Sequence, residues 1–341
     1  MKNTTSSYIA VAAIVIIVLA LFSWIIISNN SPGQGETDQA TPPGDVNMVD
    51  VNVGEGEGDE DDDSPAAPKK LDAIVDVDVP NGTNLIKNGD AEAGKTSGWD
   101  GFASIVPKPH NGSNAFLLKR SERAFSDGLI PLDPKAKYKL SGFFMAEETP
   151  TKAYIGFDCF DANGQRIRSM EVTPIPRSET ELVEDAKKGD TVLKIKDGSA
   201  WKFEKWTPPY GVVAFEVDTS GAYRDLPNRK ITSKGITAIT KADGYWEVKL
   251  KSPMRENYAA GTAVRQQRSQ GAFCWVSGRG VKDKWLEISG FMSGVSGGGQ
   301  KKDMFWPGTR FIRVAILNLN HSKKASHNLL VDDVVLEIAP K

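Results

Sequence analysis

The sequence contains many close pairs of Asp and Glu residues, and paired carboxylates can perform acid–base chemistry. Asp158 lies three residues before Asp161, and Glu216 lies two residues before Asp218. A glycosidase uses two carboxylates about 5–10 Å apart on either side of a cleft. Neighbouring residues single out neither pair, so the sequence permits a glycan-active hydrolase but gives that function the least support.

Other catalytic signatures are missing from the sequence. It contains neither a G-x-S-x-G nucleophile elbow nor an H-E-x-x-H zinc motif. The glycine-rich run Gly294–Gly299 lacks the following Lys and Ser or Thr of a phosphate-binding loop. The three histidines are scattered at 110, 321 and 327, which does not favour a His-rich metal site. We therefore predict a protein that is not an enzyme.

Aromatic residues provide a second kind of chemistry, because sugars stack their C–H faces on aromatic rings beside polar side chains. Seven tryptophans follow residue 30. Four aromatic residues lie beside Pro, Gly or Lys and are expected near loops: Trp201, Trp206, Tyr210 and Trp306. They are the candidate ligand-binding residues, although each ring can instead pack in a core.

The chain has only two cysteines, Cys159 and Cys274, so it has neither a disulfide framework nor a four-cysteine zinc site. Both are expected in strands, and Cys159 shares a strand face with Ile155 and Phe157. The two cysteines can be free buried thiols or can form one disulfide, because the sequence does not show whether they lie close together.

Strands are expected to position the candidate residues above, because apolar and polar residues alternate along much of the chain after residue 84. Gly, Pro, Asn and Asp separate the alternating segments, and Glu181–Lys188 is the best candidate for a short helix. The predicted strands are 137–145, 153–160, 191–195, 212–217, 246–250, 310–317 and 329–338. Many short strands with frequent turns indicate an all-β sandwich or barrel.

Several segments resemble the galactose-binding-like jelly-roll superfamily, which includes carbohydrate-binding modules of bacterial cellulases and xylanases. Residues 84–94 (NLIKNGDAEAG), followed by Gly98-Trp99, resemble its opening strand, and residues 329–336 (LLVDDVVL) resemble its closing strand. Residues 130–143 and 156–161 are similar to its central part. The resemblance implies a jelly-roll β-sandwich fold.

The same resemblance implies a structural calcium ion that ties the first strand to the last. The matching positions are Asp90, Glu92 and Asp332, and carboxylate oxygens are ligands that Ca²⁺ prefers. Alternatively, Asp90 fixes a turn, and Asp332 and Asp333 point to opposite faces of the strand. The resemblance further implies a carbohydrate or envelope polymer as the partner.

Residues 178–268 do not fit the jelly-roll pattern and are expected to form an inserted small β subdomain. The sandwich would then consist of residues 84–177 and 269–338. An insertion in a surface loop costs little free energy when its two ends lie close together.

The N-terminal residues indicate a membrane anchor. Residues 8–28 are apolar and uncharged, and about 20 helical residues span the roughly 30 Å core of a bilayer. A cleaved signal peptide is the alternative, but it usually has a shorter apolar region and a small-residue cleavage site. Lys2 precedes the span and no base follows until Lys69, which predicts cytoplasmic residues 1–7 and extracytoplasmic C-terminal domains.

Residues 29–83 are expected to form a disordered acidic stalk. The segment 31–68 carries eleven Asp and Glu residues and no base. The remaining chain from Lys69 onward has 41 bases and 33 acids, a net charge of +8. No nucleic-acid motif accompanies these bases, so no nucleic-acid partner is expected.

Together, these features predict a single-pass, envelope-exposed carbohydrate-binding module that acts in adhesion, retention or scaffolding without catalysis. The alternative is a structural or protein-interaction module that binds no sugar. The carbohydrate prediction depends mainly on the family resemblance, and a shared fold does not determine function.

Overall fold

The computed structural model describes residues 82–320 and 327–340. The predicted cytoplasmic segment 1–7, the predicted membrane anchor 8–28 and nearly all of the predicted stalk 29–83 lie outside the described residues. Within the described ranges, no helix has the length and apolar character needed to cross a membrane.

The described chain consists of antiparallel strands and loops with almost no helix, so the all-β prediction is confirmed. The two helices, α2 (Ser169–Val172) and α3 (Thr207–Tyr210), are each a single turn. The expected helix at Glu181–Lys188 was wrong. Its first residue belongs to strand β8 (Thr180–Glu181), and Ala186 pairs with Tyr258, so neighbouring segments take the backbone hydrogen bonds that a helix would need.

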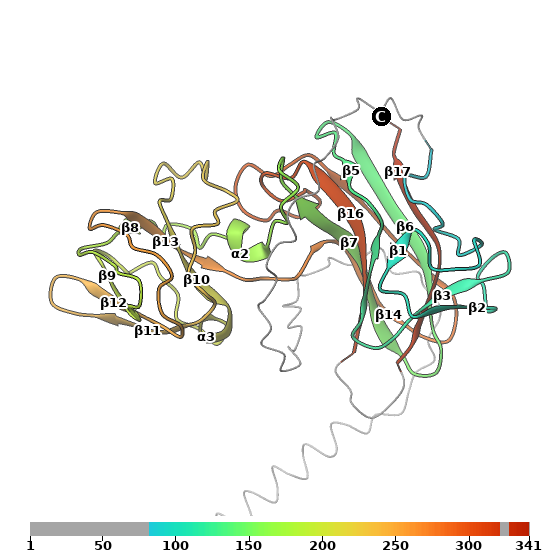
Figure 1. Ribbon diagram of the computed structural model, residues 1–341, viewed down its shortest axis with the longest axis horizontal. Coiled ribbons are helices and arrows are strands. Elements are labelled where there is room, and N and C mark those ends of the chain that lie inside the picture. Colours follow the sequence, from blue (N-terminus) through green and yellow to red (C-terminus); the bar gives the residue numbers. More distant parts are fainter. Residues whose placement is uncertain (1–81, 321–326, 341) are drawn as a thin grey trace, which may run out of the picture. The chain divides into compact units, whose positions relative to one another are not determined.

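Two sheets form the sandwich (Figure 1). Sheet A has the order β1-β4-β16-β7-β14, and β5 also pairs with β16; sheet B has the order β15-β6-β17-β3-β2. The strands of sheet A are β1 (Trp99–Asp100), β4 (Arg123–Ser126), β5 (Ile130–Pro131), β7 (Thr151–Phe160), β14 (Cys274–Val281) and β16 (Phe311–Leu319). The strands of sheet B are β2 (Ser104–Val106), β3 (Ala115–Leu118), β6 (Lys137–Ala146), β15 (Leu286–Ser293) and β17 (Leu329–Ile338).

The beginning of the described chain lies against its last strand. Residues 84–98 form turns rather than the expected opening strand. Leu85 donates to the carbonyl of Leu336, and Val334 donates to the carbonyl of Gly89, both at 2.8 Å. The two ends of the sandwich sequence are therefore neighbours, as the resemblance implied, but irregular backbone makes the contact.

The sandwich core contains apolar side chains from both sheets, including Phe116, Phe144, Phe157 and Val314. One amide is buried among them. Asn318 of β16 is completely inaccessible, and its Nδ2 donates to the carbonyls of Leu118 (3.1 Å) and His327 (2.6 Å). Its Oδ1 accepts the hydroxyl of Thr151 at 2.6 Å. This side chain therefore connects the two sheets through hydrogen bonds.

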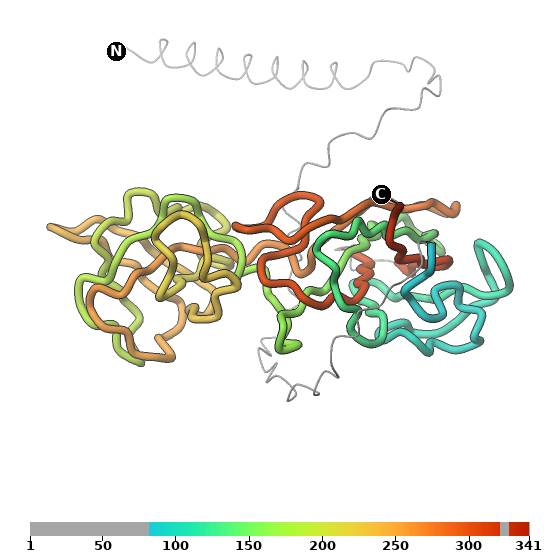
Figure 2. Tube along the Cα trace, turned by 90° about the horizontal axis from the view of Figure 1, so that it is seen from above, coloured from blue at the N-terminus to red at the C-terminus, as the bar shows by residue number. Residues whose placement is uncertain are grey.

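The chain trace of residues 178–268, the inserted lobe, runs from light green to orange in Figure 2. These residues contain two three-stranded sheets and a separate apolar core. One sheet has the order β10-β13-β8, and the other has the order β11-β12-β9. Besides β8, the strands are β9 (Val192–Ile195), β10 (Gly211–Phe215), β11 (Ile236–Lys241), β12 (Trp246–Leu250) and β13 (Ala263–Arg268). Because the lobe has its own core, the sandwich does not depend on it for apolar burial.

Both cysteines are buried as free thiols in the sandwich core. The hydrogen bond between Cys274 and the Cys159 side chain, together with burial, raises the pKa of the Cys274 thiol well above its usual value. The two side chains are thus neighbours, and burial and this contact favour the protonated form of Cys274.

We expect Asn318→Ala to lower the free energy of unfolding by about 2–4 kcal/mol, because it leaves a buried hydroxyl and two buried carbonyls without partners. Denaturant unfolding followed by tryptophan fluorescence measures this change. The control is Asn163→Ala at an exposed turn, for which we expect a change within about 0.5 kcal/mol. Equal effects of the two substitutions would contradict the structural role of Asn318.

Candidate functional site

The outer face of sheet A carries the largest group of interacting aromatic and charged side chains that we find on the described sandwich. Strand alternation creates this face. In β7, Ala153, Ile155, Phe157 and Cys159 point into the core, so the residues between them point outward. The outward set is Tyr154, Gly156, Asp158 and Phe160.

One row of this face crosses four strands. Phe125 of β4 pairs with Ala315 of β16, Ala315 pairs with Gly156 of β7, and Gly156 pairs with Trp275 of β14. The two central residues are small. A Cβ atom added at Gly156 would lie 3.0 Å from Cε3 of Trp275 and 2.5 Å from the Cys274 carbonyl oxygen. The tryptophan ring therefore lies close over Gly156, where no larger residue fits without displacement.

Four rings form a continuous strip across the face. The centroid of Phe273 lies 5.5 Å from that of Phe125 and 5.1 Å from that of Trp275, and Tyr154 lies 5.4 Å from Trp275. Phe273 is buried, whereas Phe125, Tyr154 and Trp275 are half-buried. The three half-buried rings combine fixed positions with partial exposure, which is the requirement for an apolar stacking surface.

Three arginines lie against this strip. The guanidinium carbon of Arg313 is 4.1 Å from the centroid of Phe125. Those of Arg166 and Arg123 lie 5.2 Å and 5.6 Å from the centroid of Phe273. These distances allow cation–π attraction, which holds the charged groups on the aromatic surface.

Asp158 orders two of the three arginines. Its Oδ1 accepts Nε of Arg166 at 2.6 Å, and its Oδ2 accepts Nη2 of Arg313 at 2.8 Å. The Asp158 side chain is only 1% exposed. One buried carboxylate thus fixes two partly exposed guanidinium groups, whose remaining N–H groups can donate to another molecule.

Arg123 differs from the other two arginines because it has no ion-pair partner among the described residues. Burial among its neighbours, followed by repulsion from Arg166, lowers the pKa of its guanidinium, while Asp158 has the opposite effect. The group nevertheless stays charged at neutral pH. We name these seven residues the arginine–aromatic face: Arg123, Phe125, Tyr154, Arg166, Phe273, Trp275 and Arg313.

The acidic residues of the two carboxylate pairs named above already have partners. Both oxygens of Asp158 bind arginines, and Asp161 accepts Nη1 of Arg229 at 2.8 Å. Glu216 is paired with Lys230. Asp218 accepts the backbone N–H groups of Arg224 and Ser220, which lower its pKa to about 2. Each of these carboxylates has a structural partner that accounts for its position.

The three carboxylates expected to bind calcium lie around the loop formed by residues 107–114 or next to it. Oδ2 of Asp332 accepts the N–H groups of His110 (2.8 Å) and Asn111 (3.3 Å), while Oε1 of Glu92 accepts those of Ser113 and Asn114. Asp90 accepts only the N–H of Glu92, at 3.3 Å. Burial raises the pKa of Asp332, although its backbone hydrogen bonds oppose this shift.

In this arrangement the carboxylates hold the backbone of the 107–114 loop, which fits their geometry better than binding a cation does. Calcium needs six to eight oxygen ligands, whereas backbone N–H groups occupy the oxygens of Asp332 and Oε1 of Glu92. Within the described ranges, no group of three His, Cys, Asp or Glu residues could hold a metal ion. The calcium ion therefore remains a prediction from the resemblance.

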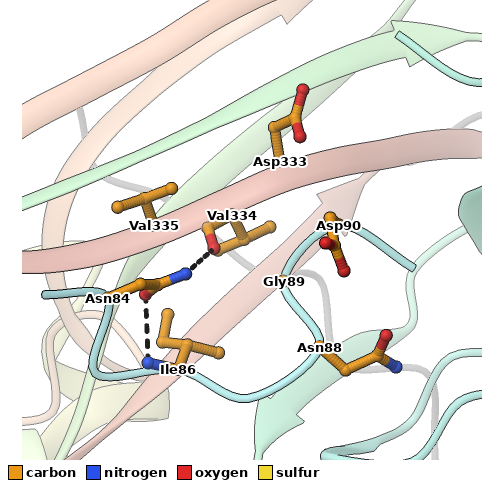
Figure 3. A pocket seen from close by; sticks show the side chains of 8 residues that line it. All are labelled: Asn84, Ile86, Asn88, Gly89, Asp90, Asp333, Val334 and Val335. Atoms are coloured by element: carbon orange, nitrogen blue, oxygen red, sulfur yellow. Dashed lines mark hydrogen bonds between the residues drawn. The ribbon is translucent and has the colours of Figure 1, made fainter. Parts of the chain in front are cut away.

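A cavity of about 280 Å³ lies where the first segment meets β17 (Figure 3). Asn84 spans its edge, donating to the carbonyl of Val334 and accepting the N–H of Ile86. Asp90 and Asp333 are the only carboxylates that line it, and Asp333 also binds Nδ1 of His110 at 2.9 Å. Four of its eight lining residues are polar, and each of these four side chains already takes part in hydrogen bonds within the protein.

The four aromatic residues expected to bind a ligand do not form one site. Trp201 belongs to the core of the inserted lobe, and Trp306 belongs to the core of the sandwich. Trp206 and Tyr210 are half-buried next to or in α3, where the guanidinium of Arg268 lies 4.9 Å from the Trp206 ring. A buried ring has no face for a sugar to stack on, so only the α3 pair retains that capacity.

Sequence reasoning missed most of the arginine–aromatic face. Tyr154 lay in a predicted strand opposite the core positions, and this alternation was the available signal. Phe125, Phe273 and the three arginines come from separate segments. Only the strand register brings them together.

We expect Asp158→Ala to destabilise the protein by about 2–4 kcal/mol, because it removes the buried charge that holds two guanidinium groups together. Arg123→Ala on the same face is the matched control, since it breaks no ion pair, and a loss below about 1 kcal/mol is expected. Both values come from denaturant unfolding. A similar small loss for Asp158→Ala would show that the arginines do not depend on it.

We also expect thermal midpoints in calcium and in chelator to agree within about 1 °C, because backbone N–H groups already use the oxygens of Asp332 and Oε1 of Glu92 that a stabilising ion would need. Differential scanning calorimetry measures both midpoints. A midpoint that rises with calcium concentration, and is lost in Asp332→Asn, would instead support the calcium ion implied by the resemblance.

A xylan-binding domain is among the solved structures that match this chain. No protein-family model matches the sequence, and no curated protein matches it. A solved structure described as the CBM22-1 xylan-binding domain from Paenibacillus barcinonensis Xyn10C is 9% identical. The match covers 74% of this chain and 93% of that domain, with a TM-score of 0.31. A TM-score of this size does not establish a shared fold.

Proposed function

We propose that this protein is a membrane-anchored carbohydrate-binding module of the jelly-roll type, exposed at the cell envelope. It acts in adhesion, retention or scaffolding without catalysis. The arginine–aromatic face is the observation that carries this proposal, because it combines partly exposed rings with fixed polar donors on one sheet.

The chemistry of this face suits a sugar. Tyr154 and Trp275 offer adjacent half-buried rings that can receive the C–H face of a pyranose. Arg313 and Arg166 hold N–H donors against Phe125 and Phe273 of the same strip, in positions set by Asp158. A sugar combines apolar C–H groups with hydroxyls, so a surface with both features can bind and orient it.

Anchoring and export are proposed on sequence grounds. The apolar residues 8–28 have the length of a membrane span. Lys2 precedes this span and no base follows it until Lys69, which favours export of the following domains. The acidic segment that follows would separate the folded part from the bilayer.

A protein-interaction role is the second candidate, and the inserted lobe favours it. Phe203 is 51% exposed, and Trp206 and Tyr210 lie nearby in the sequence with half-buried side chains. Exposed aromatic residues are enriched at protein interfaces. This candidate uses a different surface from the sugar-binding proposal, so mutations distinguish the two.

We expect the full-length protein to bind at least one polysaccharide on a glycan array, and Tyr154→Ala to weaken this binding about tenfold through lost ring stacking. Phe291→Ala is the matched control, because this ring is 44% exposed on sheet B. The affinity of the Phe291→Ala variant for the glycan should equal that of the unchanged protein. Incubation of the unchanged protein with the bound glycan should release no new reducing ends, because no hydrolysis is expected.

Failure of the natively folded protein to bind any glycan would overturn the proposal. Glycan binding that is lost in Phe203→Ala but kept in Tyr154→Ala would move the site to the inserted lobe. New reducing ends that disappear in a carboxylate variant would instead indicate a hydrolase.

A further inference from the structure

The arginine–aromatic face carries more positive than negative charge. Three guanidinium groups lie on it, from Arg123, Arg166 and Arg313, and Asp158 is the carboxylate among them. Asp100 is a second acid at the β1 edge, where it pairs in register with Phe125. Asp158 is buried under its two arginines, so the groups presented outward are mainly cationic.

Arg123 is the clearest sign of a missing anion. It is an exposed residue whose charged group packs against Phe273, yet no carboxylate in the described ranges pairs with it. Its main electrostatic neighbours are Arg166, which has the same charge, and Asp158, which already binds two other arginines. A ligand carboxylate at this position would relieve the repulsion and bind the planar guanidinium in a two-point contact.

We infer that this face selects carboxylate-bearing polysaccharides, in which a uronic acid group binds Arg123 while an adjacent sugar ring stacks on Tyr154 or Trp275. This inference rests on the proposed carbohydrate-binding function and adds the chemical class of the glycan. The strip of rings provides the stacking surface, and the unpaired arginine provides the charge preference.

The carboxylate also explains why the face contains three arginines. Neutral sugars are usually oriented by amide, hydroxyl and carboxylate side chains, which match their hydroxyl groups. Arginine instead provides a planar set of donors that matches a carboxylate. A surface selective for neutral sugars has no need of an additional guanidinium group that repels its neighbour.

The test compares acidic glycans with neutral derivatives of the same backbone. The probes are oligosaccharides of polygalacturonate, alginate and hyaluronan, each as the free acid and as the carboxyl methyl ester. Affinities are measured by isothermal titration calorimetry with the full-length chain in a polyoxyethylene detergent, which contains no sugar headgroup.

We expect at least one free acid to bind tenfold or more tightly than its methyl ester, with an affinity that falls as salt is added. Arg123→Gln should remove this preference, since it deletes the charge without breaking an ion pair. Lys139→Gln on sheet B is the matched control: it makes the same change in net charge, at the ion pair with Glu337, and should leave the preference intact.

Two results would overturn the inference. One is that every free acid and its methyl ester bind with equal affinity, while Tyr154→Ala still weakens glycan binding. This result would leave the proposed function standing. The other is an acid preference that Arg123→Gln does not change. If the folded protein bound none of these glycans, and none of the neutral glycans on the array, both the proposed function and the inference would be overturned.

Discussion

The antiparallel pairing of β7 with β16 is the constraint on which the rest of the sandwich depends. It joins nine residue pairs, from Phe311 with Phe160 to Leu319 with Lys152. These strands come from opposite sides of the inserted lobe in the sequence. Because a strand alternates its side chains, this one register sets both the core and the outer face. A shift by one residue would turn Arg313 and Asp158 toward the apolar core and turn Ile155 and Val314 away from it.

This register also explains how a charged group is tolerated on a largely apolar sheet. Arg313 pairs directly with Asp158 across the two strands, so the carboxylate meets its partner without any loop rearrangement. Arg166 approaches from the segment after β7 and binds the second oxygen. The desolvation of Asp158 is thereby offset by three charge-assisted hydrogen bonds, one to Oδ1 and two to Oδ2.

Much of the fold could be predicted from the sequence, because alternation and turn residues are local signals. The strand at 153–160 and the inward position of Cys159 follow directly from that pattern. The turns at 84–98 could not be distinguished from a strand, since their hydrogen bonds go to residues about 250 positions later. The segment 181–188 was misjudged for a related reason, because Ala186 pairs with the distant Tyr258.

The candidate site was much harder to predict than the fold. Trp201 and Trp306 lie near loops in the sequence, yet both are buried in cores, because proximity to Pro or Gly does not determine which way a ring points. The acids Glu92 and Asp332 were recognised as important, but the chemistry assigned to them depended on the resemblance. In the structure they hold backbone N–H groups of one loop, and a sequence cannot show which donors a carboxylate will meet.

The inserted lobe contacts the sandwich through polar groups, and this has a consequence for the arginine–aromatic face. Arg229 of the lobe binds Asp161, and Asn228 donates its N–H to the carbonyl of Glu171. Asp161 follows β7 directly, and its other oxygen accepts the N–H of Gln165, one residue before Arg166. Arg229 of the lobe therefore stabilises the turn that places Arg166 next to Asp158. The lobe thus supports one of the cations of the face through hydrogen bonds, while its own apolar core remains separate.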